Sequence, residues 1–189
     1  MVDVGSTIPT PLVQAIAEAA ALGNLRYAEA LARQVRALDE DQGKDLFEAL
    51  QLIRQGLRAV DRRPKDAQGH LLLARGYFFA DAGDAGLCEA TEALRLNPSL
   101  GEAAVFIGLE HCYRGELDLA RTGYEQARAL LPPSNRWLIA LGVTLRTAEA
   151  AAQNPQSPTP AANPWLRLRE KVTASTRLLG ALVGRRTSQ

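Results

Sequence analysis

The sequence predicts an all-α protein in which antiparallel helix hairpins stack into an α-solenoid. Alanine and leucine are abundant, while glycine and proline gather at segment boundaries, which favours helix. Valine, isoleucine and the aromatic residues never alternate over the length of a strand, so almost no sheet is expected. Pro64, Pro98 and Pro132 recur with a constant period of about 34 residues, each after a helical stretch. A period of this size indicates repeated helix pairs that bury their apolar faces only by stacking.

The most regular repeat unit covers residues 100–133. Small residues at fixed offsets let its two helices approach closely, an aromatic residue fills the space between successive hairpins, and a proline ends the unit. These positions are Ile107, Gly108, Gly115, Glu116, Ala120, Tyr124, Ala127 and Pro132. The unit before it, residues 66–99, matches through Leu73, Ala74, Tyr77, Ala93, Leu94, Asn97 and Pro98.

The turn of the earlier unit departs from this period. Gly83 and Asp84 precede Gly115 and Glu116 by slightly less than one period. We therefore expect a longer first helix in residues 66–99, a second helix that starts late, and a looser hairpin.

The helical pattern continues after the second unit for one more helix. Residues 135–153 match the first helix of a third unit through Leu141, Gly142 and Leu145. Residues 154–164, NPQSPTPAANP, contain four prolines. Proline removes a backbone donor and biases its predecessor towards extended geometry, so this segment is predicted to be a Pro-rich linker.

The first part of the chain, residues 9–63, keeps the helical chemistry but loses the register. It predicts three helices, at residues 10–22, 25–38 and 44–62. Gly23 and Asn24 separate the first two, and the segment DEDQGKD separates the last two. Its DED, residues 39–41, is interpreted as a solvated turn. Two pairings stay open, because either the first two helices form a degenerate repeat or the second and third helices pair.

The pattern of residues 64–153 resembles the tetratricopeptide repeat family, most closely over residues 64–148, and residues 9–63 resemble it weakly. The resemblance implies a right-handed α-solenoid whose first helices line a concave groove. The groove positions that it implies for partner binding are Leu71, Arg75, Phe78, Phe79, Glu102, Val105, Leu109, Cys112, Tyr113, Arg136, Ile139, Val143 and Arg146. This mostly apolar set with an arginine fringe suits an amphipathic helix or an extended peptide with apolar anchors and a few acids. Alternatively, some of these residues pack against neighbouring repeats.

One subclass of that family holds the terminal carboxylate of a peptide with lysines and asparagines on the first helices. This chain has Leu71 and Arg75 at the first such pair, and Val105 and Leu109 at the next. The resemblance therefore implies no recognition of acidic chaperone tails, although the arginines suit another anionic ligand.

Residues 165–184 predict a C-terminal basic amphipathic helix. Its apolar side consists of Trp165, Leu168, Val172, Leu179 and Leu182. From the start of this segment to the end of the chain the net charge is +5, which leaves −4 on the rest. Three hypotheses compete: a cap over the solenoid end, a docking helix for a partner or an acidic membrane surface, and an occupant of the groove in its own chain or a second copy. Repulsion from Arg75, Arg136 and Arg146 opposes the last of these.

The residues that could support catalysis are too sparse to predict an enzyme. His70, His111, Cys88 and Cys112 form no catalytic constellation. The sequence also lacks a glycine-rich phosphate loop, a paired-cysteine metal motif and an HExxH motif. No catalytic, cofactor or metal site is therefore expected. A net charge of +1 gives no electrostatic case for a nucleic-acid partner.

The predicted function is that of a non-catalytic adaptor, assembly factor or chaperone-like scaffold that binds a protein or peptide. The alternative is a self-assembling structural protein, a homo-oligomer in which tails or repeats pack between copies. No stretch approaches the ~20 apolar residues of a membrane span, and the start MVDVGSTIPT has no basic and apolar signal pattern. A cytoplasmic location is therefore expected.

Overall fold

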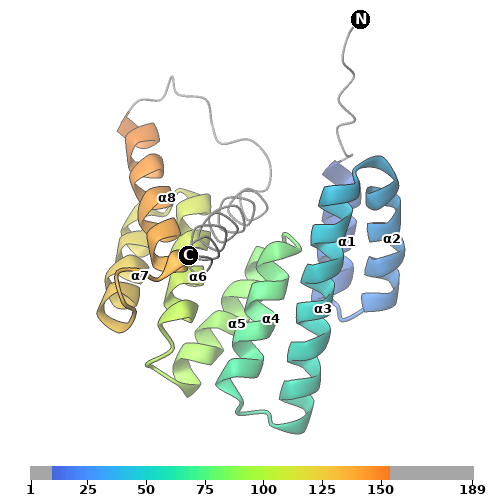
Figure 1. The fold of residues 1–189 in the computed structure, drawn as a ribbon, viewed down its shortest axis with the longest axis horizontal. Helices are drawn as coiled ribbons and strands as arrows, with labels where there is room; N and C mark the ends of the chain where they lie inside the picture. The colour runs from blue at the N-terminus through green and yellow to red at the C-terminus, as the bar shows by residue number, and fades with distance from the viewer. Residues whose placement is uncertain (1–9, 154–189) are drawn as a thin grey trace, which may run out of the picture.

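The computed structural model describes residues 10–153, and that part of the chain contains eight α-helices and no strand (Figure 1). The helices are α1 (Thr10–Ala21), α2 (Leu25–Leu38), α3 (Glu40–Arg62), α4 (Ala67–Phe79), α5 (Gly83–Leu96), α6 (Gly101–Arg114), α7 (Leu117–Leu130) and α8 (Arg136–Gln153). The all-α prediction is confirmed for these residues. The predicted linker, residues 154–164, and the predicted basic helix, residues 165–184, lie outside the described residues. From residue 10 to residue 153, no helix has both the length and the apolar character needed to cross a membrane.

The helices pack in the manner of a helical repeat. Each helix contacts the next one along the chain, and α6 also contacts α4 and α8. The helix α5 packs against α4 and α6, while α7 packs against α6 and α8. The helices α4, α6 and α8 therefore form one layer, and every hairpin buries an apolar face against its neighbour.

The helix α3 begins at Glu40, earlier than the sequence predicts. Asp39 ends α2 and caps α3, because its side chain accepts a hydrogen bond from the backbone N–H of Gln42 at 2.9 Å. Glu40 and Asp41 lie in the first turn of α3, where the helix dipole favours carboxylates. The interpretation of DED as a solvated turn is therefore wrong, since its first residue is a helix cap and the other two are helical.

The two pairings of the first three helices do not exclude each other, because α2 packs against both α1 and α3. The helix α3 makes the most extensive helix–helix contact of the described residues, with α4. There a Cβ added to Gly76 would lie only 2.6 Å from Ile53 Cγ1, so the two helices are closely packed. One continuous core therefore joins the first helices to the regular units.

The two regular units keep their register through the turn. The helix α6 begins one period after α4, and α7 begins one period after α5. Since α4 spans 13 residues and α6 spans 14, the prediction of a longer first helix and a late second helix is wrong. The left-handed turn residue is Asp81 (φ 65°), which corresponds to Gly115 (φ 71°) one period later. Aspartate is one of the few residues besides glycine that tolerate this conformation, so Gly83 is not the turn residue that its type suggested.

Replacing Asp81 with glycine is expected to raise the free energy of unfolding by about 0.5–1 kcal/mol, because glycine adopts a positive φ without steric cost. Urea unfolding followed by circular dichroism measures this change. Asp84→Gly is the matched control, because Asp84 lies in the first turn of α5, where glycine weakens the helix. A loss of stability in Asp81→Gly would contradict the assignment of the turn.

Small residues set the distance between α6 and α7. A Cβ added to Gly123 would lie 2.9 Å from the Gly108 Cα and 3.2 Å from the carbonyl oxygen of Ala104. Ala120 and Ala127, on the same side of α7, are fully buried. Gly108 thus has the close-approach role that the sequence predicts, and Gly123 is its closest counterpart.

Candidate binding surface

The residues predicted for the groove lie on α4, α6 and α8, which are neighbours in one layer. Nine of them, three on each helix, correspond from one helix to the next at a spacing of one period. We call these nine the inner face: Leu71, Arg75, Phe78, Val105, Leu109, Cys112, Ile139, Val143 and Arg146. The other four, Phe79, Glu102, Tyr113 and Arg136, lie on the same three helices. The fold thus places all thirteen residues on adjacent helices.

Exposure divides the inner face into two parts. On α4 and α6 its apolar residues are at most 7% exposed: Leu71, Phe78, Val105, Leu109 and Cys112. On α8, Ile139 is 52% exposed and Val143 is 46% exposed, and Arg146 is exposed as well. The open apolar surface of the inner face therefore lies on α8.

Four aromatic side chains join α4, α6 and α8. The ring of Phe106, which is fully buried, lies 5.9 Å from Phe78 and 6.4 Å from Phe79 between centroids. Trp137 lies 5.3 Å from Phe106 and 6.2 Å from Phe79. Rings at these separations stabilise each other beyond the area that they bury. Phe78 and Phe79 therefore help to hold the three helices together. Sequence reasoning missed Phe106 and Trp137, which do not follow the repeat period.

Two of the predicted arginines, Arg75 and Arg136, flank the ring of Trp137. Their guanidinium carbons lie 5.8 Å and 5.1 Å from the ring centroid, within the range of a cation–π interaction. Burial lowers the pKa of Arg75; the charge of Glu102 opposes this shift, and the charge of Arg136 adds to it. The Nε of Arg75 is buried and has no hydrogen-bond partner in the described part of the chain. An anionic group would therefore be favourable beside these arginines.

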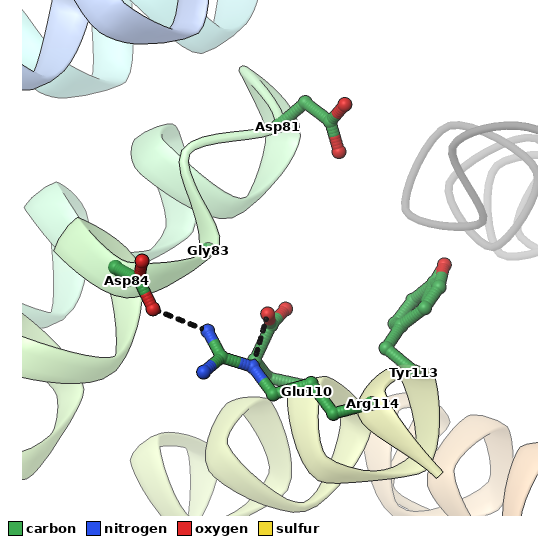
Figure 2. Close-up of a pocket in the computed structure, with 6 residues that line it drawn as sticks. All are labelled: Asp81, Gly83, Asp84, Glu110, Tyr113 and Arg114. Atoms are coloured by element: carbon green, nitrogen blue, oxygen red, sulfur yellow. Dashed lines mark hydrogen bonds and ion pairs between the residues drawn. The ribbon is translucent and has the colours of Figure 1, made fainter.

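A second feature is a pocket of about 180 Å³ where the turn between α4 and α5 meets the end of α6 (Figure 2). We call it the acidic pocket; its lining residues are Asp81, Gly83, Asp84, Glu110, Tyr113 and Arg114. Arg114 binds Asp84 at 2.7 Å and Glu110 at 3.0 Å. Gly83 leaves room for this arrangement, because an added Cβ would overlap Oε1 of Glu110. Figure 2 shows the carboxylate of Asp81 away from the ion pairs of Arg114.

Of the three carboxylates that line the acidic pocket, Asp81 is the one that Arg114 does not bind. Within residues 10–153 its carboxylate has no ion-pair partner. Partial desolvation, and secondarily the charge of Glu110, raise the pKa of Asp81 above its ordinary value. A cationic side chain would relieve both effects, so the acidic pocket favours a cation. Sequence reasoning missed Asp81 and Glu110; the only available signal was that each lies near the end of a first helix.

The buried cysteine of the inner face, Cys112, lies on α6, which packs against α8. Burial, and secondarily the charge of Glu149, raise the pKa of the Cys112 thiol to about 11, so the thiol is protonated at neutral pH. Glu149 on α8 binds Arg121 of α7 at 2.6 Å, and α8 packs against both α6 and α7. The last turns of α8 are thus held against both preceding helices.

The two histidines have structural contacts. His70 is 8% exposed; its Nδ1 lies 2.6 Å from Oε2 of Glu89, and its Nε2 lies 3.1 Å from the carbonyl oxygen of Pro64. His111 contacts Glu116 at 2.6 Å. Both histidines line an open depression between α4, α5 and α6. From residue 10 to residue 153, no group of three histidine, cysteine or acidic residues could hold a metal ion.

The stability of the protein is expected to fall as the pH rises through the pKa of His70. Burial by itself lowers this pKa, but the contacts with Glu89 and Pro64 and the nearby carboxylates outweigh burial and raise it above 6.5. A raised pKa stabilises the fold fully below the ordinary value, and this contribution is lost as the pH rises through the folded value. Urea unfolding at about pH 6 and about pH 8 measures the loss. His70→Gln should show a smaller decrease over that interval, whereas an equal decrease in both proteins would contradict the role of His70.

Comparison of the chain with protein-family models, with curated proteins and with solved structures finds no match.

Proposed function

We propose that this protein is a non-catalytic scaffold that binds a segment of a partner protein on its inner face. Successive hairpin packing and the matched left-handed turns at Asp81 and Gly115 support a tetratricopeptide-like, right-handed solenoid. In such a solenoid the first helices of the hairpins line the concave side. Those helices are α4, α6 and α8 here, so the inner face is the default binding surface.

The observation that carries the proposal is the open surface of α8. Ile139 and Val143 are about half exposed, and Arg136 and Arg146 on the same helix are exposed too. An apolar strip edged by arginines suits an amphipathic helix or extended segment with aliphatic anchors and acidic neighbours. Two apolar residues alone are common on surfaces, but these continue the nine-residue pattern of the inner face.

The two kinds of residue would contribute in different ways. Burial of the apolar strip stabilises the complex by ~25 cal/mol for each Å² of apolar surface removed from water. The arginines chiefly set the association rate and the orientation of the partner. The pair at Trp137 would bind an acidic side chain, since the Nε of Arg75 has no hydrogen-bond partner in the described residues. An adaptor, an assembly factor and a chaperone for an apolar client segment would all use such a surface.

Affinity capture from the native host tests the proposal. The full-length protein is immobilised and the bound proteins are quantified by mass spectrometry. Ile139→Asp combined with Val143→Asp should remove most of the captured partner, because two charges then occupy the apolar strip. Leu119→Asp is the matched control, since Leu119 lies on α7 and is 52% exposed. It should leave capture unchanged.

Undiminished capture by the double variant would exclude the inner face as the binding surface. Light scattering at two protein concentrations, with the same variants, separates a partner from a second copy. A mass that rises with concentration only when Ile139 and Val143 are intact would instead indicate the self-assembling structural protein.

A further inference from the structure

We propose that residues 165–184 of the same chain occupy the inner face, with the first basic residues of this segment at the acidic pocket. The inference goes beyond the proposed function, because it assigns an occupant from within the chain. It can be tested without any partner.

The ends of α4, α6 and α8 place this segment within reach. Asp81, just after α4, shares the acidic pocket with Glu110 near the end of α6. Glu149 lies near the end of α8, which packs against α6. The C-terminal ends of the three helices therefore lie on the same side of the molecule, at the top of Figure 1. The eleven residues 154–164 continue from that side and can span about 36 Å at about 3.3 Å per residue.

Charge favours that same side for the start of the segment. The carboxylate of Asp81 has no ion-pair partner among the described residues, and α4, α6 and α8 direct the negative ends of their dipoles there. The first residues after the linker include Arg167, Arg169 and Lys171 against a single Glu170. A segment that begins at the acidic pocket would run antiparallel to α4, α6 and α8, so its own dipole would also be aligned favourably.

Of the three arginines whose repulsion the sequence predicts, Arg75 and Arg136 contact Trp137, whereas Arg146 lies towards the end of α8. Trp137 is in the first turn of α8. Trp137 and Glu149 are twelve positions apart on α8, which is about 18 Å at 1.5 Å per residue. That distance exceeds the Debye length of about 8 Å at physiological ionic strength. Charges at the first turn of α8 are therefore largely screened from those at its end, whereas the exposed Arg146 opposes a basic segment there.

The segment also supplies the apolar surface that α8 would bury. Ile139 and Val143 are about half exposed on the inner face. The predicted apolar side of the segment repeats at helical spacing: Trp165, Leu168, Val172, Leu179 and Leu182. Net charges of +5 on the end of the chain and −4 on the rest add a long-range attraction.

Occupation by this segment would regulate access to the inner face. The partner and the segment compete for the same apolar strip of α8, Ile139 and Val143. Their charged contacts differ, because acidic residues of the partner would bind the arginines whereas basic residues of the segment would bind at the acidic pocket. The apparent dissociation constant of the partner then equals its intrinsic value multiplied by a factor. That factor is one plus the ratio of docked to undocked molecules. The docked segment thus raises the concentration of partner that is needed to occupy the inner face.

Hydrogen–deuterium exchange of the full-length protein, followed by mass spectrometry, tests the inference. The reference is a synthetic peptide of residues 165–184. Amides of this segment in the full-length protein should exchange at least about tenfold more slowly than in the peptide. Asp81→Asn combined with Glu110→Gln, and separately Val143→Asp, should remove most of this protection. Asp118→Asn and Leu119→Asp on α7 are the matched controls and should preserve it.

Exchange at the rate of the free peptide would overturn the inference. Protection that survives both the acidic-pocket variant and Val143→Asp would also overturn it and indicate a cap elsewhere. Protection that is lost on dilution would indicate a second copy. Because no partner is present, none of these outcomes affects the proposed function. Partner capture that is undiminished by Ile139→Asp combined with Val143→Asp, with residues 165–184 protected as expected in the unsubstituted protein, would be evidence against the proposed function alone.

Discussion

Replacing Phe106 with alanine is expected to lower the free energy of unfolding by about 3–5 kcal/mol, the cost of removing a large aromatic side chain from a core. Phe106 is fully buried, and its ring packs against Phe78, Phe79 and Trp137. Its loss leaves a cavity at the junction of α4, α6 and α8. For a chain of this size, the melting temperature should fall by roughly 6–20 °C.

Val143→Ala is the matched control for Phe106→Ala. Val143 also lies in this layer of helices but is 46% exposed, so its truncation should cost less than about 1 kcal/mol. Calorimetry and urea unfolding measure both variants. Similar costs for the two substitutions would show that Phe106 does not join the three helices in the way described.

Gly123→Leu is expected to lower the free energy of unfolding by about 3 kcal/mol or more, because the new side chain would meet backbone. A Cβ at this position would lie 2.9 Å from the Gly108 Cα and 3.0 Å from its nitrogen. Backbone cannot rotate away as a side chain can, so α6 and α7 would have to separate. The gain in helix propensity from glycine to leucine, about 0.8 kcal/mol, is too small to compensate.

Thr122→Leu, one residue earlier on α7, provides the comparison. Thr122 is exposed, so leucine there should change the free energy of unfolding by less than about 0.5 kcal/mol. Urea unfolding of both variants gives the difference. A Gly123→Leu protein as stable as the unsubstituted chain would contradict the close approach of α6 to α7.

The sequence predicts the helices well because their signals are local. Proline and glycine mark most boundaries, and α2 begins and ends where the pattern predicts. The errors arise where one residue type can take two conformations. Asp81 adopts the left-handed conformation, which aspartate takes less often than glycine. Asp39 caps a helix, although its acidic neighbours suggest a solvated turn.

The candidate surface is harder to predict, because exposure depends on residues far apart in the chain. The repeat period places Val105 and Ile139 at equivalent positions, yet Val105 is fully buried and Ile139 is 52% exposed. The acidic pocket brings together Asp81 and Glu110 from different hairpins. Only the packing of α4 against α6 reveals that proximity.

Photo-crosslinking from the inner face tests the central claim most directly. A photoreactive phenylalanine analogue is placed at Val143 or, as the control, at Leu119, whose exposure is similar. We predict that Val143 crosslinks to residues 165–184 in the purified protein and to a partner in cells of the native host. The control position should give neither product. A partner crosslinked from Leu119, with no product from Val143, would contradict the assignment of the inner face as the binding surface.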